Sequence, residues 1–347
     1  MLFSIIVNNY NYAAYVGQAI ESALNQTYAP IEVIVVDDGS TDHSREVIAS
    51  FGDRITALFK ENGGQNSACN VGWLEAKGDM VLFLDSDDVL LPQAVEKCVA
   101  ALRGTDAAKA QFLLKRVDAN LELIDGVMPF YGLKGNKPRE DIARWGHYKT
   151  SPTSANAYSR EFLELVMPIP EFRKSEPYYM WQDTYLAQIS GLMDKVTSLH
   201  EPLGLYRVHE RNNSDASKVP SVQKLRRLFM NDYLREKYQI PWGEKFGLHC
   251  KSDRTRFCPH VCKQRFLAYR LQPVGHPIME DNYWYLLKAG LTGAICFPYM
   301  DFHKRVFVFL GFLALALMPR FMLQNMLGMI TRPEERNGIF SLLRFGY

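Results

Sequence analysis

Residues 80–88 read MVLFLDSDD, and this stretch decides the fold that we expect for the chain. The apolar run that opens it is typical of a strand buried on both faces, as in parallel sheets. Asp85, Asp87 and Asp88 follow at once. Like charges packed this closely repel one another and raise one another's pKa, a conflict that a divalent cation removes. Because one or two carboxylates plus substrate phosphates usually hold Mg²⁺ or Mn²⁺, the stretch predicts a metal site at a strand end.

Outward from this stretch, apolar runs alternate with amphipathic stretches. Strands that alternate with helices imply a parallel sheet covered on both faces, with ligands bound beyond the carboxyl ends of the strands. A looser region at about 110–150, with many turn residues, indicates added antiparallel strands and loops. The expected strands are 3–8, 31–36, 55–59 and 80–84, and the expected helices are about 13–26, 42–51, 65–76, 92–104, 159–167 and 182–192.

Two further segments follow predicted strands. Asp37 and Asp38 close the apolar strand IEVIVV, and NGGQNSACNVG (62–72) enters a helix through two glycines. Backbone N–H groups at such a helix start suit a phosphate, which makes Gly63 and Asn70 candidates for ligand binding. Ordinary turn chemistry and helix capping by aspartate are the alternatives for the carboxylates, and ordinary loop chemistry is the alternative for the glycines.

Charge is distributed unevenly over the 347 residues, which are 47% hydrophobic with a net charge of +2. Residues 1–220 hold 21 basic and 29 acidic residues, whereas residues 221–347 hold 19 and 9. The near-neutral total gives no reason to expect a nucleic-acid binder. The asymmetry predicts an acidic region that carries the chemistry and a basic region that meets an anionic partner, such as a membrane surface.

An apolar segment near the C-terminus supports that interpretation. Residues 306–318, VFVFLGFLALALM, lie between basic residues and are shorter than the roughly 20 residues that span a bilayer. A second apolar helix is expected from Phe321 to Ile330. We predict an in-plane membrane anchor within about 304–330, with a buried core helix or a spanning hairpin as alternatives.

The cysteines are sparse, and no basic, apolar leader with a cleavage site opens the chain. Reduced thiols and a cytoplasmic location are therefore expected. The group His249, Cys250, Cys258, His260 and Cys262 has enough ligands for zinc, but its spacing does not match the usual Cys-x2-Cys pairs.

Four motifs in register carry a family resemblance: FSIIVNNYN, VIVVDDGSTD, ENGGQNSACNVG and FLDSDD. Together they resemble the nucleotide-sugar-binding half of family 2 glycosyltransferases. The resemblance implies the GT-A fold, a Rossmann-like α/β fold with a mostly parallel central sheet and helices on both faces. A C-terminal helical, partly apolar extension would follow it. The expected domains are 1–220, divided into a donor half (1–104) and an acceptor-side half (105–220), and the basic region 221–347, whose apolar segment the resemblance does not cover.

The same resemblance implies roles for the donor-side residues. Asn8 and Tyr10 would lie beside the base of the nucleotide, Asp38 would accept from the base or ribose, and Asp85 would approach the ribose or sugar. Asp87 would be the metal-binding aspartate of the Asp-x-Asp motif, with Asp88 beside it. The chain departs from the family wording at Asn8, where proline is frequent, and at Cys69, where arginine is frequent, so a donor-phosphate contact from Cys69 is in doubt.

On the acceptor side, MWQDTYL (180–186) is similar to the Glu-Asp helix start of the family, with Gln182 in place of the first acid. Asp183 is therefore the candidate general base, and helix capping is its alternative role. YRVHERNNS (206–214) resembles a loop whose histidine reaches the metal or diphosphate. His209 would supply that ligand and Arg207 would neutralise phosphate charge, with a structural ion pair as the alternative for Arg207.

The resemblance thus implies an inverting transfer from a nucleotide diphosphate sugar, with a UDP-sugar favoured, that uses Mn²⁺ or Mg²⁺. The implied acceptor is a cell-envelope glycan or a lipid-linked intermediate, reached from the cytoplasmic face of the membrane. One alternative is a nucleotidyltransferase, although the loop Asn8–Tyr12 lacks the glycine and basic residues that hold a triphosphate. The other is a catalytically silent carbohydrate-binding protein, although all of the metal-site acids are present.

Overall fold

The computed structural model describes residues 1–130, 132–133, 137–146, 148–171, 181–209, 222, 225–226, 229–230, 240–248, 258–297 and 300–331. These residues fall into two compact units. The first lies within 1–142, 148–209 and 245–248, and the second within 143–147, 210–244 and 249–347. The expected domain boundary after residue 220 lies outside the described residues.

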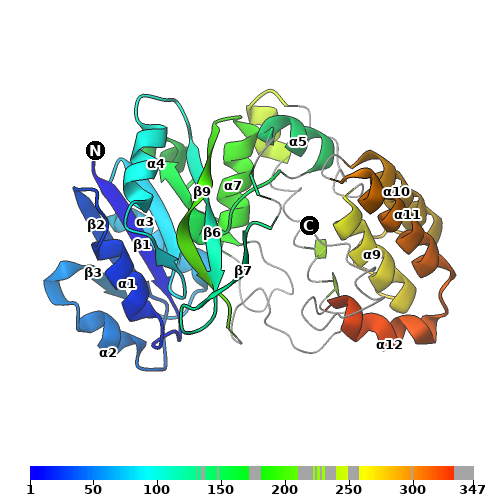
Figure 1. Cartoon of the computed structure of the whole chain (residues 1–347), viewed down its shortest axis with the longest axis horizontal. Helices are drawn as coiled ribbons and strands as arrows, with labels where there is room; N and C mark the ends of the chain where they lie inside the picture. The colour runs from blue at the N-terminus through cyan, green and yellow to red at the C-terminus, as the bar shows by residue number, and fades with distance from the viewer. Residues whose placement is uncertain are drawn as a thin grey trace. The chain divides into compact units, whose positions relative to one another are not determined.

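A single mixed sheet organises the first unit (Figure 1). Its strand order is β3-β2-β1-β4-β8-β6-β9-β5, and β7 pairs with β6. The strands are β1 (Phe3–Asn9), β2 (Ile31–Asp37), β3 (Thr56–Phe59), β4 (Met80–Asp85), β5 (Val89–Leu90), β6 (Lys109–Val117), β7 (Leu123–Met128), β8 (Asn156–Ser159) and β9 (Val196–Arg207).

The parallel half of the sheet matches the sequence prediction. Strands β3, β2, β1 and β4 run parallel, while β8 pairs antiparallel with both β4 and β6. Strands β5 and β7 are also antiparallel to their neighbours, whereas β9 runs parallel to β6. The far half of the sheet is therefore more mixed than a mostly parallel sheet, because β8 reverses direction between β4 and β6.

The register of β1 brings polar residues to one edge. Asn8 lies opposite Val36 on β2 and Asp85 on β4, and Asn9 lies opposite Asp37. Since the carboxyl ends of parallel strands meet at the same edge, side chains separated by up to 77 positions in the sequence become neighbours.

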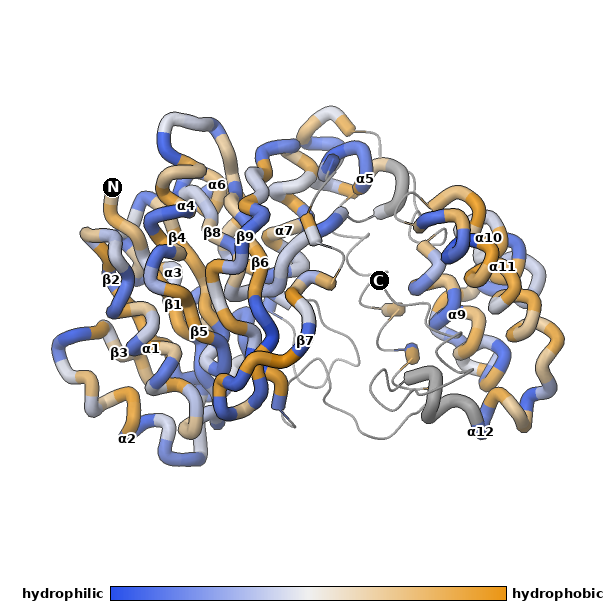
Figure 2. The backbone as a smooth tube through the Cα atoms, viewed as in Figure 1, coloured by the Kyte–Doolittle hydropathy of each residue, from blue (hydrophilic) through white to orange (hydrophobic). Residues whose placement is uncertain are grey.

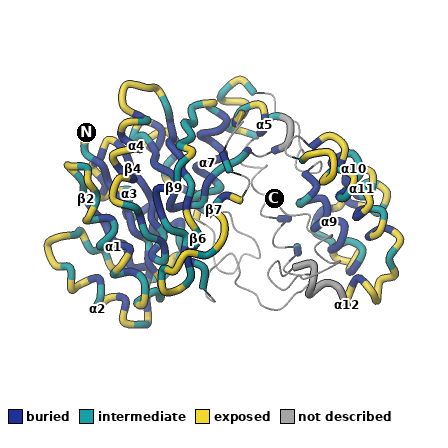
Figure 3. Tube along the Cα trace, in the orientation of Figure 1, coloured by how far each residue is buried: buried dark blue, intermediate teal, exposed yellow. Residues whose placement is uncertain are grey.

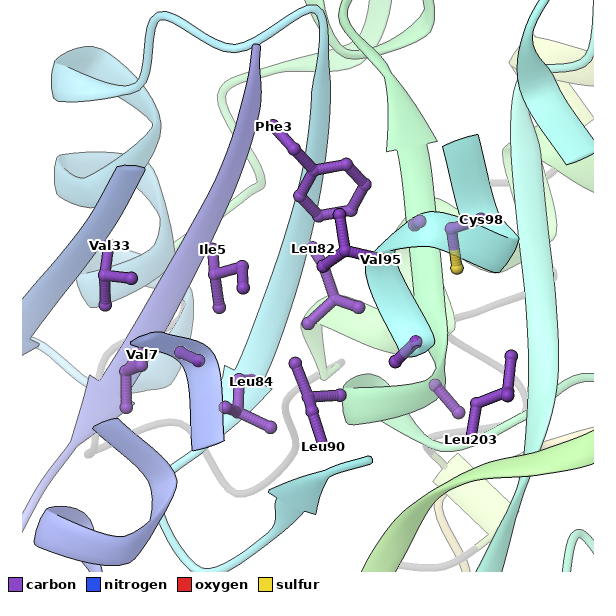
Figure 4. Close-up of a cluster of buried hydrophobic side chains, with 14 of the residues drawn as sticks. Phe3, Ile5, Val7, Val33, Leu82, Leu84, Leu90, Val95, Cys98 and Leu203 are labelled. Atoms are coloured by element: carbon purple, nitrogen blue, oxygen red, sulfur yellow. The ribbon is translucent and has the colours of Figure 1, made fainter. Parts of the chain in front are cut away.

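Helices cover both faces of this parallel half. Phe3, Ile5 and Val7 point into a core with side chains from α1 and α4 (Figure 4), and the central strands are buried throughout their apolar runs (Figure 3). On the opposite face, α3 packs closely against Ile6 and Val36 through Gly72. The helices of this unit are α1 (Val16–Leu24), α2 (Ser44–Ala49), α3 (Gln65–Glu75), α4 (Ala94–Leu102), α5 (Pro138–Trp145), α6 (Arg160–Val166) and α7 (Gln182–Leu192).

Most helices are shorter than the sequence pattern predicts. For example, α1 begins at Val16 rather than at residue 13, because residues 12–15 form a turn in which the Tyr15 N–H donates to the Tyr12 carbonyl at 2.9 Å. Helix α7 has the predicted bounds. Through the parallel half, the unit therefore follows the predicted order of strands and helices and differs only at element ends. The far half adds strands β5 to β9 and helix α5, which the sequence pattern did not locate.

The described part of the second unit is helical. It contains α9 (Pro259–Leu271), α10 (Tyr283–Cys296), α11 (Phe302–Leu317) and α12 (Arg320–Thr331), and apolar residues run along α10 and α11 (Figure 2). Gly290 of α10 faces the Phe312 ring of α11 so closely that a methyl group could not be accommodated. Among the described residues, no helix combines the length and apolar character needed to cross a membrane.

Two helical glycines give a matched test of the packing at α3. A Cβ at Gly72 would overlap Ile6 and lie 3.2 Å from Val36, whereas a Cβ at Gly17 of α1 would be 3.4 Å from Val47, an ordinary contact. We expect Gly72→Ala to destabilise the protein by about 1–3 kcal/mol. Gly17→Ala should be neutral or stabilising by up to about 1 kcal/mol, because alanine favours helix. Urea unfolding followed by circular dichroism measures both, and equal effects would contradict the packing described for α3.

Candidate functional site

The loop after β4 places three carboxylates at the polar edge of the sheet. Asp88 is buried, and both of its oxygens accept hydrogen bonds: Oδ2 from Ser154 Oγ at 2.6 Å and Oδ1 from the Arg207 backbone N–H at 3.1 Å. Burial, followed by the charges of Asp87 and Asp85, raises the pKa of Asp88 well above its usual value. Asp88 therefore ties the loop to β9, and its contact with a metal stays a prediction.

Asp85 occupies the centre of this edge. Its Oδ1 accepts from Asn8 Nδ2 at 3.2 Å and from Gln65 Nε2 at 2.7 Å. Burial, followed by the charge of Asp87, raises the pKa of Asp85 to about 7. Two side-chain amides thus aim the carboxylate, while its neighbours oppose its ionisation.

Asp87 is paired with a residue from the far half of the sheet. His209 Nε2 lies 3.1 Å from Asp87 Oδ2, and the side chains are 4% and 14% exposed. The tautomer of the imidazole decides which nitrogen donates. The structure therefore joins two residues predicted to bind metal, although they are separated by 122 positions in the sequence.

Arg207 lies beneath this pair and is almost fully buried. Its Nε donates to the Asp87 carbonyl at 2.8 Å, Nη1 donates to the Ala119 carbonyl at 2.7 Å, and Nη2 donates to Gln18 Oε1 at 2.6 Å. These bonds give the guanidinium a structural role in holding the Asp87 loop. The ion pair that is the alternative for Arg207 and its phosphate contact both stay predictions.

Asp38 organises the glycine loop before α3. Its Oδ1 accepts from Lys60 Nζ at 2.6 Å and from the Gly63 N–H at 2.8 Å, and its Oδ2 accepts from the Gly64 N–H at 2.7 Å. Gly64 has a φ of +91°, which glycine adopts without strain. In this arrangement the Gly63 N–H faces Asp38, so a phosphate at Gly63 or a nucleotide at Asp38 would compete with these bonds.

Asn70 has a different environment from the one predicted. It is buried and exchanges hydrogen bonds with the backbone of Ile169, accepting from its N–H at 2.8 Å and donating to its carbonyl at 2.9 Å. Its Nδ2 also lies 3.0 Å from Glu171 Oε1. Asn70 thus fixes the segment that follows α6, and its donor contact stays a prediction. Cys69 beside it is fully buried.

Asp183 lies in the first turn of α7, where its Oδ1 accepts from the Thr184 N–H at 2.6 Å. Its negative charge contributes to raising the pKa of Asp85 and of Cys69, which places the candidate base within electrostatic reach of the donor side.

Tyr10, at the end of β1, is 41% exposed.

The donor atoms suit a divalent cation that is completed by its substrate. Among the described residues, no group of three or more His, Cys, Asp or Glu side chains could hold a metal ion. The Asp87–His209 pair supplies two ligands, and the raised pKa of Asp85 marks a surplus of negative charge beside it. Two protein ligands plus diphosphate oxygens and water are sufficient for Mg²⁺ or Mn²⁺, so the residues fit the predicted metal.

The predicted alternative of a zinc site is only partly testable, because His249 and Cys250 lie outside the described residues. Of the others, Cys262 Sγ donates to the Leu286 carbonyl, and His260 Nε2 pairs with Gln264 at 2.8 Å. None of the described cysteines forms a disulfide.

Sequence reasoning missed several residues that hold the site. Ser154 contacts both Asp85 and Asp88, and no local signal singles it out within its segment. Gln65 had a usable signal, because it begins α3 directly after the two glycines. Tyr12 and Tyr15 pack around His209 and also went unnoticed.

Comparison with known proteins places this arrangement in a family. Residues 4–166 match the family described as Glycosyl transferase family 2. An uncharacterized glycosyltransferase of Nostoc is 35% identical over 277 residues, which cover 74% of this chain and 83% of that protein. An uncharacterized glycosyltransferase of Rickettsia prowazekii is 47% identical over 105 residues, which cover 30% of this chain and 33% of that protein.

The fold is similar to that of a solved structure as well. TarS 1–349 of S. aureus in complex with UDP-GlcNAc has a TM-score of 0.53 at 15% identity, over 94% of this chain and 91% of that one. The chain therefore belongs to glycosyltransferase family 2 and has the α/β fold of GT-A enzymes with a C-terminal helical region. Family membership favours glycosyl transfer over the nucleotidyltransferase alternative.

The crowding of carboxylates around Asp85 leads to a prediction for the pH dependence of thermal stability. Because the pKa of Asp85 is about 7 in the fold and about 4 in an unfolded chain, its contribution to stability falls as the pH rises from 4 to 7. Asp85→Asn removes this loss, so its melting temperature relative to wild type should increase between pH 5 and pH 8 in EDTA.

Asp37 provides the control, because its pKa is shifted in the opposite direction to that of Asp85. Burial alone would raise its pKa, but hydrogen bonds from Ser40, Arg45 and Asn9 outweigh burial and lower it. Asp37→Asn should therefore reduce the melting temperature by a similar amount at pH 5 and pH 8, since both lie above its titration range. A pH-independent difference for Asp85→Asn would contradict the charge crowding described here.

Proposed function

We propose that this protein transfers a sugar from a nucleotide diphosphate donor, favoured to be a UDP-sugar, to a hydroxyl acceptor with inversion at the anomeric carbon. One observation carries the proposal. The Asp87–His209 pair, the aimed carboxylate of Asp85 and the candidate base Asp183 belong to one compact unit and interact electrostatically.

The donor would bind at the polar edge of the parallel strands. Tyr10 is exposed there, and Asn8 holds its amide against Asp85. Asp38 and Gly63 form one wall through their mutual hydrogen bond. TarS, which shares this fold, was solved with UDP-GlcNAc, and this supports a nucleotide-sugar donor.

Asp87 and His209 would hold Mn²⁺ or Mg²⁺, which supplies positive charge to the departing diphosphate. The chain itself fixes these ligands in advance. Arg207 anchors the Asp87 carbonyl, and Asp88 anchors the backbone of Arg207. A loop fixed in this way loses little entropy when the donor binds.

Asp183 would accept the proton of the acceptor hydroxyl as its oxygen attacks the anomeric carbon. Its place in the first turn of α7 favours the ionised carboxylate, because the helix N-terminus carries partial positive charge. The hydrogen bond from the Thr184 N–H orients one oxygen. A general base needs to be held within hydrogen-bond reach of the acceptor hydroxyl, and the fixed backbone of α7 supports Asp183 in this role.

The reaction is tested by incubating the full-length protein with a panel of nucleotide sugars and Mn²⁺ or Mg²⁺ and measuring released nucleoside diphosphate. We expect release with at least one donor and its loss in EDTA. Asp183→Asn should reduce transfer by about 10²-fold or more with donor affinity unchanged, because it removes proton transfer alone. Absence of binding and release with every donor would refute the proposal, and unchanged transfer by Asp183→Asn would remove that residue from the role.

We also infer that the acceptor is a cell-envelope glycan or a lipid-linked intermediate, and that the enzyme works at the cytoplasmic face of a membrane. Helix α11 supports this inference. Phe302, Val306, Leu310 and Leu317 are exposed at spacings that place them along one side of the helix. Its 16 residues span about 24 Å, less than the roughly 30 Å of a bilayer core, which favours a helix lying in the plane of the interface.

The neighbouring charges favour anionic lipid as the occupant of this side. From residue 283 to 325 the sequence contains Lys288, Lys304, Arg305 and Arg320, but Asp301 as its sole acid. Trp284 and Phe321 are also exposed, and aromatic side chains of this kind suit a lipid headgroup region.

A matched pair of double variants tests the membrane contact. Phe302→Ser with Leu310→Ser should weaken binding of the full-length protein to phosphatidylglycerol vesicles by at least about tenfold, because two apolar side chains no longer leave water. Leu74→Ser with Leu123→Ser alters equally exposed leucines of the first unit and should leave binding unchanged. Sedimentation with the vesicles measures both double variants. If both bind the vesicles as well as the wild type does, α11 is not the membrane-binding surface.

A further inference from the structure

The ring of Tyr15 contacts both the imidazole of His209 and the guanidinium of Arg207. The Tyr15 and His209 ring centroids are 4.7 Å apart with an interplanar angle of 33°. On Arg207, Cζ lies 4.6 Å from the Tyr15 centroid. One aromatic side chain thus contacts a proposed metal ligand and the arginine that anchors the Asp87 carbonyl.

The imidazole of His209 contacts two aromatic rings. Its side chain is 4% exposed, and Tyr12 packs edge-on against it at 5.5 Å and 71°. Tyr15 packs against it at a tilt, and the imidazole Nε2 lies 3.1 Å from Asp87 Oδ2. Rotation of the imidazole would disrupt these ring contacts and the contact with Asp87.

Tyr15 also contacts the guanidinium of Arg207, which hydrogen bonds hold in place. The Arg207 guanidinium is bonded to the carbonyls of Asp87 and Ala119 and to Gln18 of α1. Arginine over an aromatic ring contributes further attraction. Tyr15 itself precedes α1, fixed by its N–H bond to the Tyr12 carbonyl at 2.9 Å. The start of α1 is therefore coupled to both members of the Asp87–His209 pair.

We propose that Tyr15 is a positioning residue that orients His209 toward Asp87 and thereby sets the metal affinity of the pair. This inference rests on the proposed function, in which His209 and Asp87 hold the cation. Tyr15 acts through His209 and Arg207 rather than through substrate. Residues that orient metal ligands typically change metal affinity by 10–100-fold when they are replaced.

The test measures Mn²⁺ binding to the full-length protein in the presence of UDP by calorimetry, together with UDP binding in EDTA. We expect Tyr15→Leu and Tyr15→Met to weaken Mn²⁺ binding about tenfold, because neither has a ring face. Tyr15→Phe keeps the ring and should restore affinity to within about twofold of wild type. UDP binding in EDTA should be unchanged in all three variants.

Tyr28 supplies the matched control. It is half-buried like Tyr15, it packs on the hydrophobic core of the first unit, and its hydroxyl donates to the Met1 carbonyl. Tyr28→Leu should lower the melting temperature but leave Mn²⁺ affinity unchanged. Equal losses of Mn²⁺ affinity in Tyr15→Leu and Tyr28→Leu would reduce Tyr15 to a general stability role and overturn the proposal.

His209→Ala separates this inference from the proposed function. It should weaken Mn²⁺ binding in the wild-type background and add little in Tyr15→Leu, because both changes disrupt the same ligand. Wild-type Mn²⁺ affinity in Tyr15→Leu and Tyr15→Met, with a loss in His209→Ala, overturns the role of Tyr15 alone. Wild-type affinity in His209→Ala as well overturns the metal assignment of the proposed function.

Discussion

Three carboxylates, Asp85, Asp87 and Asp88, lie within four residues at the end of β4, and their mutual repulsion is the constraint on which the site depends. Neutral donors hold two of them. Ser154 and a backbone N–H bind Asp88, and amides bind Asp85. Burial and mutual repulsion oppose the ionisation of Asp85 and Asp88 in the ligand-free state and favour a bound cation at this edge of the sheet.

Side-chain to backbone hydrogen bonds hold the surrounding loops. Asp38 binds the amides of Gly63 and Gly64, and Asn70 binds the backbone of Ile169. The donor contacts that the sequence suggested for these residues stay predictions. The same polar residue types satisfy buried backbone groups and bind ligands, because the hydrogen-bonding chemistry is shared. A motif match alone therefore identified residues of the site without distinguishing those that contact substrate from those that support the loops.

Much of the fold was predictable because it follows from local patterns. Apolar runs of strand length alternated with amphipathic helices, and the parallel pairing among β1, β2, β3 and β4 followed from that alternation. The antiparallel insertion of β8 was not predictable, because Asn156–Ser159 is four residues long and carries no strand signal of its own. For the site, the strand-end acids were predictable as a group, while the partners Ser154, Tyr12 and Tyr15 were not.

By itself the sequence determined the family, the order of the elements in the parallel half, and the crowding of acids after β4, since these depend on residues close together along the chain. Only the tertiary structure decided that His209 pairs with Asp87, that Arg207 binds carbonyls beneath them, and that Tyr15 contacts both His209 and Arg207. These contacts join β9, β4 and α1. They depend on how the strands order themselves in the sheet and on which side chains then share a buried volume, and no spacing along the sequence encodes either.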